Sequence, residues 1–474
     1  MRVTLNVEES LFEMTLNAVD LEISEVKLET ADGKVLADKV TYKPDLEQVV
    51  FAWPQVIAPG AAILSLRFAG ALASDLRGFY LTKVNAGKQP ILIAATQCEA
   101  TDARRIFPCW DEPEFKARFG VSLVIDASLV ALANGPELRS EPVGSDKRRV
   151  VFGDTMPMST YLVALVVGPL EITKPVMADK VPIRIASRPG FSHLTDMAQE
   201  AAVGTLLFFS NYFGIPYAGD KLDHVAIPDF EAGAMENLGC VTYREELLLI
   251  DPDKASAQEK MHVVSVIAHE TAHMWFGDLV TMRWWNGIWL NEAFATFMEH
   301  LATDALHPEW HIWTSFGHTR AQALAIDGLQ ATRPVEFPVG PPSEAWAMFD
   351  VLTYQKGNAI LRMMEQYIGP EVFQKGIQHY LSKHRYGNTE TNDLWDALEE
   401  VSGQPVRSVM DSWVFQGGYP LLEATLNKDG KTLELAQKPF RYQGHGEGEW
   451  QVPVVLSVGR RHDAPKSIHV LQAA

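Results

Sequence analysis

The segment "VSVIAHETAHMWFGDLV" places two histidines and a carboxylate within one predicted helix, at His269, Glu270 and His273. Residues four positions apart lie one helical turn apart on the same face, so both imidazoles can point at one cation. Glu270 is rotated by about 100° from His269, beside such a cation, where a general base for a water molecule is needed. The residues alone leave two interpretations open: a metal site with a base, or histidines that bond to the backbone or to each other.

A third ligand is predicted on a second helix. Zinc in hydrolases takes three protein ligands and leaves one position for water. Glu292, in "WLNEAFATFMEH", follows His273 by nineteen positions and lies in the first turn of the next predicted helix, with Asn291 as the expected cap. The intervening segment contains Gly277 and Asn286-Gly287, which can reverse the chain and bring the second helix beside the first. We therefore expect both helices to supply ligands to one metal ion.

Other polar and aromatic residues around this motif are assigned structural roles. Glu299 and His300 are rival metal ligands further along the second helix, and His262 precedes His269 by seven positions on a similar helix face. Three tryptophans of the connecting segment are expected to fill the core around the two helices: Trp284, Trp285 and Trp289.

The pattern along the chain predicts a multidomain α+β protein. Residues 1–168 consist of short alternating apolar runs, such as "RVTLNVEE" and "FGVSLVIDA", which are typical of an all-β sandwich or saddle domain. Residues 169–412 form an α+β block, and residues 413–474 return to alternating strands as a small β domain. Helical spacing predicts a helix in "LTDMAQEAAVGTLLFFSNYFG", ending at Gly214. Further helices are predicted at about 256–276, 291–305, 343–368, 371–384 and 391–402.

Composition limits the class of protein. A chain of 474 residues, 47% of them hydrophobic, is long enough for two to four globular domains. The net charge of −19 argues against nucleic acid as a partner, and no apolar run reaches the ~20 residues of a membrane-spanning helix. The start, "MRVTLNVEESLFEM", has no export signal, so we expect a cytoplasmic protein. Cys98, Cys109 and Cys240 fit reduced thiols, and a homo-oligomer is left open.

At this point the motifs resemble a known family. The pattern His-Glu-x-x-His, then eighteen residues and Glu, is the zinc signature of the gluzincins, and "GAMEN" at 233–237 is the hallmark of their aminopeptidase N type, which includes the alanyl and puromycin-sensitive enzymes. The segments 96–119, "TQCEATDARRIFPCWDEPEFKARF", and 349–363, "FDVLTYQKGNAILRM", also look like family segments in the family order. The resemblance implies a thermolysin-like catalytic domain behind the N-terminal β domain.

The resemblance implies a catalytic set and one zinc ion per chain. His269, His273 and Glu292 would bind the zinc, which lowers the pKa of a water molecule to about 7. Glu270 would take the proton as general base and deliver it to the leaving amine. Tyr354, in "TYQKG", would donate a hydrogen bond to the oxyanion that forms at the attacked carbonyl.

The resemblance also implies a substrate-binding set that selects peptides with a free amino terminus. Glu236 of "GAMEN" and Glu99 of "TQCEA" would bind the α-ammonium group by charge-assisted hydrogen bonds. Gln97 would line the pocket for the first side chain, and the backbone of Gly233 and Ala234 would pair with the substrate as an added strand. The full predicted set is Gln97, Glu99, Gly233, Ala234, Met235, Glu236 and Asn237.

The chain also departs from the family pattern. Family members usually continue past "WVFQGGYP" with a β-sandwich and a large helical domain, whereas only about 60 residues follow here. We therefore expect a form that lacks the helical domain and has a more open cleft. Glu231 stands where small or neutral residues are common, which leaves open a preference for Lys or Arg as the first residue. Ala232 offers no extra calcium ligand of the kind associated with acidic-residue preference.

Two other functions compete with a zinc aminopeptidase. A bifunctional epoxide hydrolase of the leukotriene hydrolase type typically reads "GGMEN", whereas this chain reads "GAMEN". A non-catalytic peptide-binding scaffold of the same fold typically loses the zinc residues, whereas all three predicted ligands, Glu270 and Tyr354 are present here. We therefore expect a zinc-dependent aminopeptidase that hydrolyses the N-terminal residue from peptides.

Overall fold

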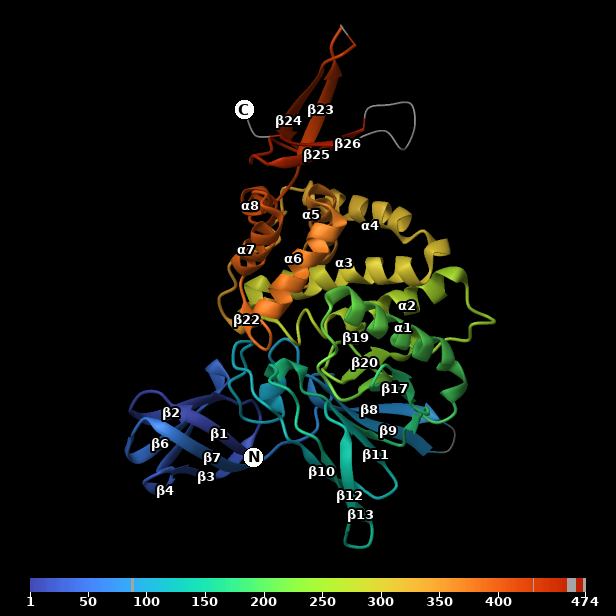
Figure 1. The fold of residues 1–474 in the computed structure, drawn as a ribbon. Coiled ribbons are helices and arrows are strands. Elements are labelled where there is room, and N and C mark those ends of the chain that lie inside the picture. Colours follow the sequence, from blue (N-terminus) through green and yellow to red (C-terminus); the bar gives the residue numbers. More distant parts are fainter. Residues whose placement is uncertain (87–88, 429, 458–465, 472–474) are drawn as a thin grey trace. The chain divides into compact units, whose positions relative to one another are not determined.

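The computed structural model describes residues 1–86, 89–428, 430–457 and 466–471, and its contacts divide the chain into two compact units (Figure 1). The first unit comprises Met1–Lys174, Arg184–Ser192 and Gly219–Glu246. The second unit comprises Pro175–Ile183, His193–Ala218 and Leu247–Ala474. The division into three domains at residues 168 and 412 remains a prediction.

The first unit begins with two antiparallel sheets, because alternating apolar residues give each strand one face to bury. The strand orders are β1-β7-β3-β4 and β2-β6-β5. Leu16, Leu28, Phe51 and Leu64 from four different strands are buried together in one core. The strands are β1 (Arg2–Val7), β2 (Leu11–Asn17), β3 (Glu22–Thr30), β4 (Gly33–Leu36), β5 (Lys39–Lys43), β6 (Gln48–Ile57) and β7 (Gly60–Ala69).

Two further sheets of this unit have the orders β11-β14-β9-β8 and β10-β13-β12. Ala131, Val150 and Phe152 belong to a second, smaller core that these sheets bury. The strands are β8 (Gly78–Ala86), β9 (Gln89–Gln97), β10 (Ser122–Asp126), β11 (Val130–Ala133), β12 (Glu137–Val143), β13 (Lys147–Phe152) and β14 (Leu165–Gly168). Strand β9 ends at Gln97, so the predicted binding residue Glu99 follows directly after a strand.

A mixed sheet carries the segment 233–237. Its strand order is β15-β17-β18-β20-β19, and β16 pairs with β17. Every residue of β18 is buried, and β18 runs parallel to β20, whereas β19 pairs antiparallel with β20. The strands are β15 (Glu171–Ile172), β16 (Val176–Ala178), β17 (Val181–Ser187), β18 (Leu222–Ile227), β19 (Ala234–Met235) and β20 (Cys240–Arg244).

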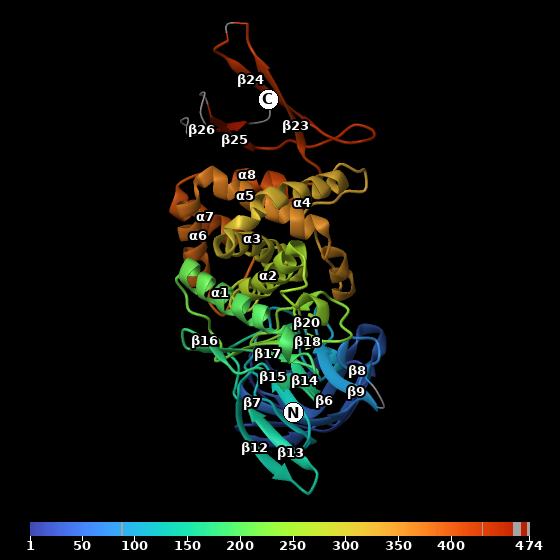
Figure 2. The same cartoon turned by 90° about the vertical axis from the view of Figure 1, so that its right-hand side faces the viewer.

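The second unit is mainly helical (Figure 2). Its centre is aromatic: the Phe276 ring stacks on Phe294 at a centroid distance of 4.4 Å, and Trp275 packs against Phe209 and Phe213. The helices are α1 (Asp196–Phe213), α2 (Ala257–Ala272), α3 (Trp289–Leu306), α4 (Ile312–Asp327), α5 (Gly357–Ile368), α6 (Pro370–Lys383), α7 (Thr391–Ser402) and α8 (Val406–Val414). Strands β21 (Thr281–Met282) and β22 (Asn388–Thr389) form a short parallel pair.

The chain ends in two antiparallel hairpins within the described residues. Strands β23 (Pro420–Leu426) and β24 (Leu433–Pro439) form one hairpin, and β25 (Val452–Ser457) and β26 (Lys466–Leu471) form the other. The predicted return to strands is thus correct, although its first residues, Trp413 and Val414, still belong to α8. No helix of the described residues is long and apolar enough to cross a membrane.

The predicted multidomain α+β fold with an N-terminal β region is confirmed, and two details of the helix prediction are wrong. The helix predicted at 343–368 is broken into a 3-10 helix (Pro342–Met348), a π-helical turn (Leu352–Lys356) and α5. Helices α4 and α8 were not predicted. Helix α4 buries only four of its residues, so its apolar periodicity is weak.

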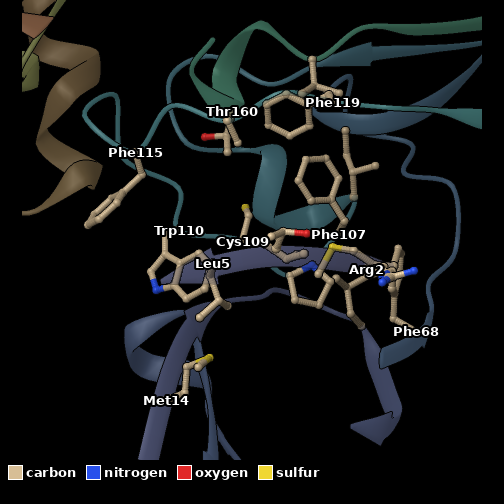
Figure 3. A pocket seen from close by; sticks show the side chains of 18 of the residues that line it. Arg2, Leu5, Met14, Phe68, Phe107, Cys109, Trp110, Phe115, Phe119 and Thr160 are labelled. Atoms are coloured by element: carbon tan, nitrogen blue, oxygen red, sulfur yellow. The ribbon is translucent and has the colours of Figure 1, made fainter. Parts of the chain in front are cut away.

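A large cavity lies within the first unit (Figure 3). Its volume is about 1770 Å³, and residues of β1 and β2 line it together with the segment 105–122. Figure 3 shows the side chains of Phe68, Phe107, Trp110 and Phe115 on its walls. Among the described residues that line it, none belongs to the predicted catalytic, metal-binding or substrate-binding sets.

Candidate metal centre and substrate-binding segments

Helix α2, which carries the two histidines, begins at a capping box. The Ser256 hydroxyl accepts a hydrogen bond from the Glu259 backbone N–H, and the Glu259 carboxylate accepts one from the Ser256 backbone N–H. The helix ends at Ala272, and His273 follows as its C-terminal cap in helical conformation. His269 and His273 therefore keep the one-turn spacing that the sequence predicts.

Helix α3, which carries Glu292, begins earlier than predicted. A 3-10 turn (Trp285–Gly287) leads directly into it, so the helix starts at Trp289 and Ile288 is its cap. The prediction of Asn291 as the cap is therefore wrong. Asn291 lies inside the first turn, and its side-chain amide donates to the Met282 sulfur at 3.1 Å.

The structure brings the three predicted metal ligands together. The Nε2 atoms of His269 and His273 lie 3.1 Å apart. Oε2 of Glu292 lies 3.3 Å from Nε2 of His269 and 3.5 Å from Nε2 of His273. His273 and Glu292 are buried, and the side chain of His269 is 14% exposed.

The contacts of the two Nδ1 atoms, which face away from the cluster, determine what the Nε2 atoms can bind. Nδ1 of His273 lies 2.8 Å from the carbonyl oxygen of Phe276, which can only accept, so this nitrogen carries the hydrogen. Nδ1 of His269 lies 3.3 Å from a carboxylate oxygen of Glu299. In their neutral forms both rings then direct a lone pair from Nε2 toward each other and toward Glu292. Three acceptors that converge on one point fit a divalent metal ion with nitrogen and oxygen ligands.

The electrostatics of the cluster agree with this donor set. Burial would lower the pKa of His269, but the carboxylates of Glu292 and Glu299 outweigh burial and raise that pKa well above its ordinary value. Burial would raise the pKa of Glu292, but His273 and His269 outweigh it and hold that pKa well below its ordinary value. The cluster therefore favours a positive charge at its centre.

Two further predicted catalytic residues lie beside the cluster. Glu270 is buried on α2, and one of its carboxylate oxygens lies within 4.8 Å of a ring nitrogen of His273. The ring of Tyr354 lies nearly parallel to that of His269, with a centroid distance of 6.2 Å and an angle of 18°. The second unit therefore groups a potential base and a potential hydrogen-bond donor with the metal ligands.

Two cations, the half-buried Arg333 and the buried Lys356, fix the π-helical turn Leu352–Lys356 that carries Tyr354. Arg333 donates to the Thr353 hydroxyl at 2.9 Å. The ammonium of Lys356 lies 2.8 Å from a carboxylate oxygen of the buried Asp327. Neither contact was predicted, because the spacings of 20 and 29 residues follow no secondary-structure period. The lysine directly after "TYQ" was the one available signal, since a lysine buried in an apolar helix needs an acidic partner.

In the first unit, the structure brings the two predicted ammonium-binding residues together. Glu99 and Glu236 are both buried, and an oxygen of one carboxylate lies within 4.8 Å of an oxygen of the other. The Gln97 side chain donates to the Met235 sulfur at 3.4 Å, which joins the end of β9 to the segment 233–237. Two buried carboxylates at this distance repel each other and are stabilised by a shared cation.

The rest of the segment 233–237 lies at the edge of the mixed sheet. Ala234 and Met235 pair with Tyr243 and Thr242 of β20, and the Arg244 backbone N–H donates to the Gly233 carbonyl at 3.0 Å. The Asn237 amide donates to the Thr242 hydroxyl at 3.1 Å. Because β19 is the last strand in the sheet order of the described residues, its outer edge fits an added strand.

The residues assigned structural roles occupy different environments. Trp285 and Trp289 are buried, as predicted, whereas Trp284 is half-buried and His262 is exposed. His300 directs Nδ1 to the Thr296 carbonyl of its own helix at 2.7 Å, and its ring packs against Trp313 and Phe316. The side chain of Glu231 is 55% exposed and lies 3.8 Å from Arg77.

Comparison with known proteins agrees with these motifs. Residues 1–162 match the model of the peptidase M1 N-terminal domain, and residues 197–413 match the model of the peptidase family M1 domain. The chain is 42% identical to aminopeptidase M1 of Arabidopsis thaliana over 451 residues, which are 94% of this chain and 51% of that protein. It is 41% identical to aminopeptidase 2 of Candida albicans (96% of this chain, 49% of that protein).

A third relative is the puromycin-sensitive aminopeptidase of Caenorhabditis elegans, which is 38% identical over 96% of this chain and 49% of its own length. The chain therefore spans about half the length of the curated relatives it matches. The two family models together cover most of the chain, and they include both the helix pair that carries the metal ligands and the segment after β9. The chain belongs to peptidase family M1.

Proposed function

We propose that the chain is a zinc aminopeptidase that removes the N-terminal residue from peptides with a free amino terminus. The observation that carries this proposal is the cluster of His269, His273 and Glu292, whose Nε2 and Oε2 atoms converge while Nδ1 of each ring faces an acceptor. The three relatives described above are each named as aminopeptidases, which supports the same reaction. They favour neither the epoxide hydrolase nor the non-catalytic scaffold.

The chain's own residues divide the reaction between them. Zinc, when bound by the three ligands, supplies a Lewis acid and lowers the pKa of water near it. Glu270 takes the proton from the attacking water and passes it to the nitrogen of the departing peptide. The Tyr354 hydroxyl donates a hydrogen bond to the oxygen of the attacked carbonyl as negative charge forms there. The π-helical turn keeps the ring that carries this hydroxyl beside the ring of His269.

Glu99 and Glu236 select the amino terminus. Their buried carboxylates accept hydrogen bonds from the α-ammonium group, whose charge also relieves the repulsion between them. Acetylation removes that charge and leaves both carboxylates without the cation, so a blocked peptide binds poorly. Gln97 and Met235 line the pocket for the first side chain, the backbone of Gly233 and Ala234 pairs with the substrate, and Asn237 holds the segment to β20.

Two properties of the whole protein stay predictions. A cytoplasmic location is proposed from the sequence, and one relative, aminopeptidase 2 of Saccharomyces cerevisiae, is named mitochondrial. A homo-oligomer is the second of these predictions.

The test is turnover of a panel of chromogenic aminoacyl amides by the purified chain, with and without a chelator. We expect hydrolysis of free aminoacyl amides, loss of that activity after chelation, and recovery on addition of zinc. The same amides with an acetylated amino group should not be hydrolysed. Activity that survives complete metal removal would refute the metal role, and equal turnover of acetylated amides would refute the selection of a free amino terminus.

A further inference from the structure

Glu299 holds the side of His269 that faces away from the metal cluster. Its Oε2 lies 3.3 Å from Nδ1 of His269, whereas Glu292 lies 3.3 Å from Nε2 of the same ring. The two nitrogens of an imidazole lie on opposite sides of the ring and have separate roles. A carboxylate at Nδ1 therefore cannot share a cation that binds at Nε2, so Glu299 is not an alternative metal ligand in this arrangement.

The contact is part of the register between two antiparallel helices. Ser265 of α2 lies 3.5 Å from Thr303 of α3, then His269 meets Glu299, and then His273 meets Glu292. Residue numbers thus rise along α2 in the direction in which they fall along α3, as expected of antiparallel helices. Glu299 and Glu292 are seven residues apart on α3, two helical turns along one face, so one rigid helix presents a carboxylate to each nitrogen of His269.

The partial burial of this contact strengthens it. The side chain of His269 is 14% exposed and that of Glu299 is 21% exposed. A charge-assisted hydrogen bond is stronger where water is largely excluded than on an open surface. His273 has a parallel arrangement at the end of α2, where its Nδ1–H donates to the Phe276 carbonyl at 2.8 Å. Of the two far-side acceptors, only Glu299 is a side chain that mutation can remove.

We propose that Glu299 is a positioning residue for the metal site: it accepts the Nδ1–H of His269, keeps the lone pair on Nε2, and fixes the ring toward the metal. A carboxylate in this position also makes the ligand nitrogen more basic, and removing such a partner weakens metal affinity by about 10- to 100-fold in proteins of this kind. This inference rests on the proposed zinc site, and it assigns a function to a residue for which the sequence indicated only a structural role.

The experiment measures zinc affinity, without substrate, by competition with a chromophoric chelator. It compares the wild-type chain with E299A, E299Q and the control D304N, whose residue lies five positions further along α3 and is rotated about 140° from Glu299. We expect E299A to bind zinc about 10- to 100-fold more weakly. E299Q keeps an acceptor oxygen but loses the charge, so its affinity should be intermediate, and that of D304N should equal wild type.

Two readouts separate this role from a structural one. The visible spectrum of the cobalt-substituted chain reports ligand geometry and should change in E299A but not in D304N. Unfolding of the metal-free proteins reports their stability. If E299A does not fold, the zinc affinity of E299Q, whose side chain has nearly the same size as that of wild type, provides the test. Equal zinc affinity of wild type, E299A and E299Q would overturn the positioning role. A wild-type chain that binds no zinc would instead overturn the proposed metal site, and this role with it.

Discussion

Two groups of side chains are built in different ways: the cluster of proposed metal ligands in the second unit, and the acidic pair Glu99 and Glu236 in the first unit. His269, His273 and Glu292 come from two packed helices within 24 consecutive residues. Each histidine ring is also held at Nδ1, by the Phe276 carbonyl or by the Glu299 carboxylate. Glu99 and Glu236 are 137 positions apart, one just after strand β9 and the other just after the edge strand β19. A potential cation site can therefore be set by a local helix register or by the meeting of distant segments.

A histidine in each unit shows how its surroundings change its pKa. In the second unit, carboxylates on both sides of His269 raise its pKa well above the ordinary value. In the first unit, His224 of β18 is completely buried, and burial lowers its pKa to about 4. One histidine environment favours an added positive charge, and the other excludes it.

The largest effect is expected from the base of the metal cluster. Glu270→Gln keeps the size of the side chain but cannot take a proton, so kcat should fall by about 10²- to 10⁴-fold. The bound zinc, measured by chelator competition, should stay unchanged, because Glu270 is not among the proposed ligands. Wild-type turnover by this variant would remove Glu270 from its role.

A smaller effect is expected from the acidic pair. Hydrogen bonds to charged groups are worth about 1.5–3 kcal/mol, so Glu236→Ala and Glu99→Ala should each lower kcat/KM for free aminoacyl amides by about 10- to 100-fold. Zinc affinity should be unaffected, which distinguishes these variants from Glu299→Ala. If both variants discriminate between free and acetylated amides as well as wild type does, the acidic pair does not bind the amino terminus.

The contrast between the histidines predicts a pH dependence of stability. The ordinary pKa of histidine, about 6.5, applies in the unfolded chain, so below it the unfolded state binds a proton that folded His224 does not. The free energy of unfolding should therefore fall as pH drops from about 6.5 toward 4, by about 2 kcal/mol at pH 5. Denaturant unfolding of wild type and His224→Asn checks this, and identical pH slopes for the two would contradict it.

The smallest effect is expected at Glu231, five positions before Glu236 in the sequence. Glu231 is half-exposed and already lies near Arg77, and exposed ion pairs contribute only about 0–1 kcal/mol. Glu231→Gln should thus change the ratio of lysyl to alanyl amide hydrolysis by less than about fivefold. A change of about a hundredfold, beyond what an exposed ion pair accounts for, would instead make Glu231 a determinant of basic preference.

The metal cluster was predictable because its ligands follow helical spacing. The interval of four between His269 and His273, and a second helix nineteen residues later, predict three potential ligands without knowledge of the fold. Glu299 follows the same rule, at seven residues from Glu292, but an acid on a helix equally fits a solvated face. Its role emerges only from the register with α2.

The acidic pair was not predictable from spacing. Nothing in the pattern near Glu99 or Glu236 indicates that the end of β9 meets the edge of the mixed sheet, and only the family resemblance joined them. The break in the helix predicted at 343–368 was missed for a related reason. Apolar spacing in "FDVLTYQKGNAILRM" continues through the π-helical turn, and the partners that hold the turn, Arg333 and Asp327, lie outside the segment.

That π-helical turn has a consequence for the length of the segment. A π turn contains one residue more than the α-helical turn it replaces, so deleting one residue between Leu352 and Lys356 would let an ordinary helix close. The flanking backbone could keep its phase, but the side chains inside the turn, including that of Tyr354, would shift relative to α5. The ring of Tyr354 would then lose its present position beside His269, so this stretch tolerates exchanges of side chain far better than a change in residue number.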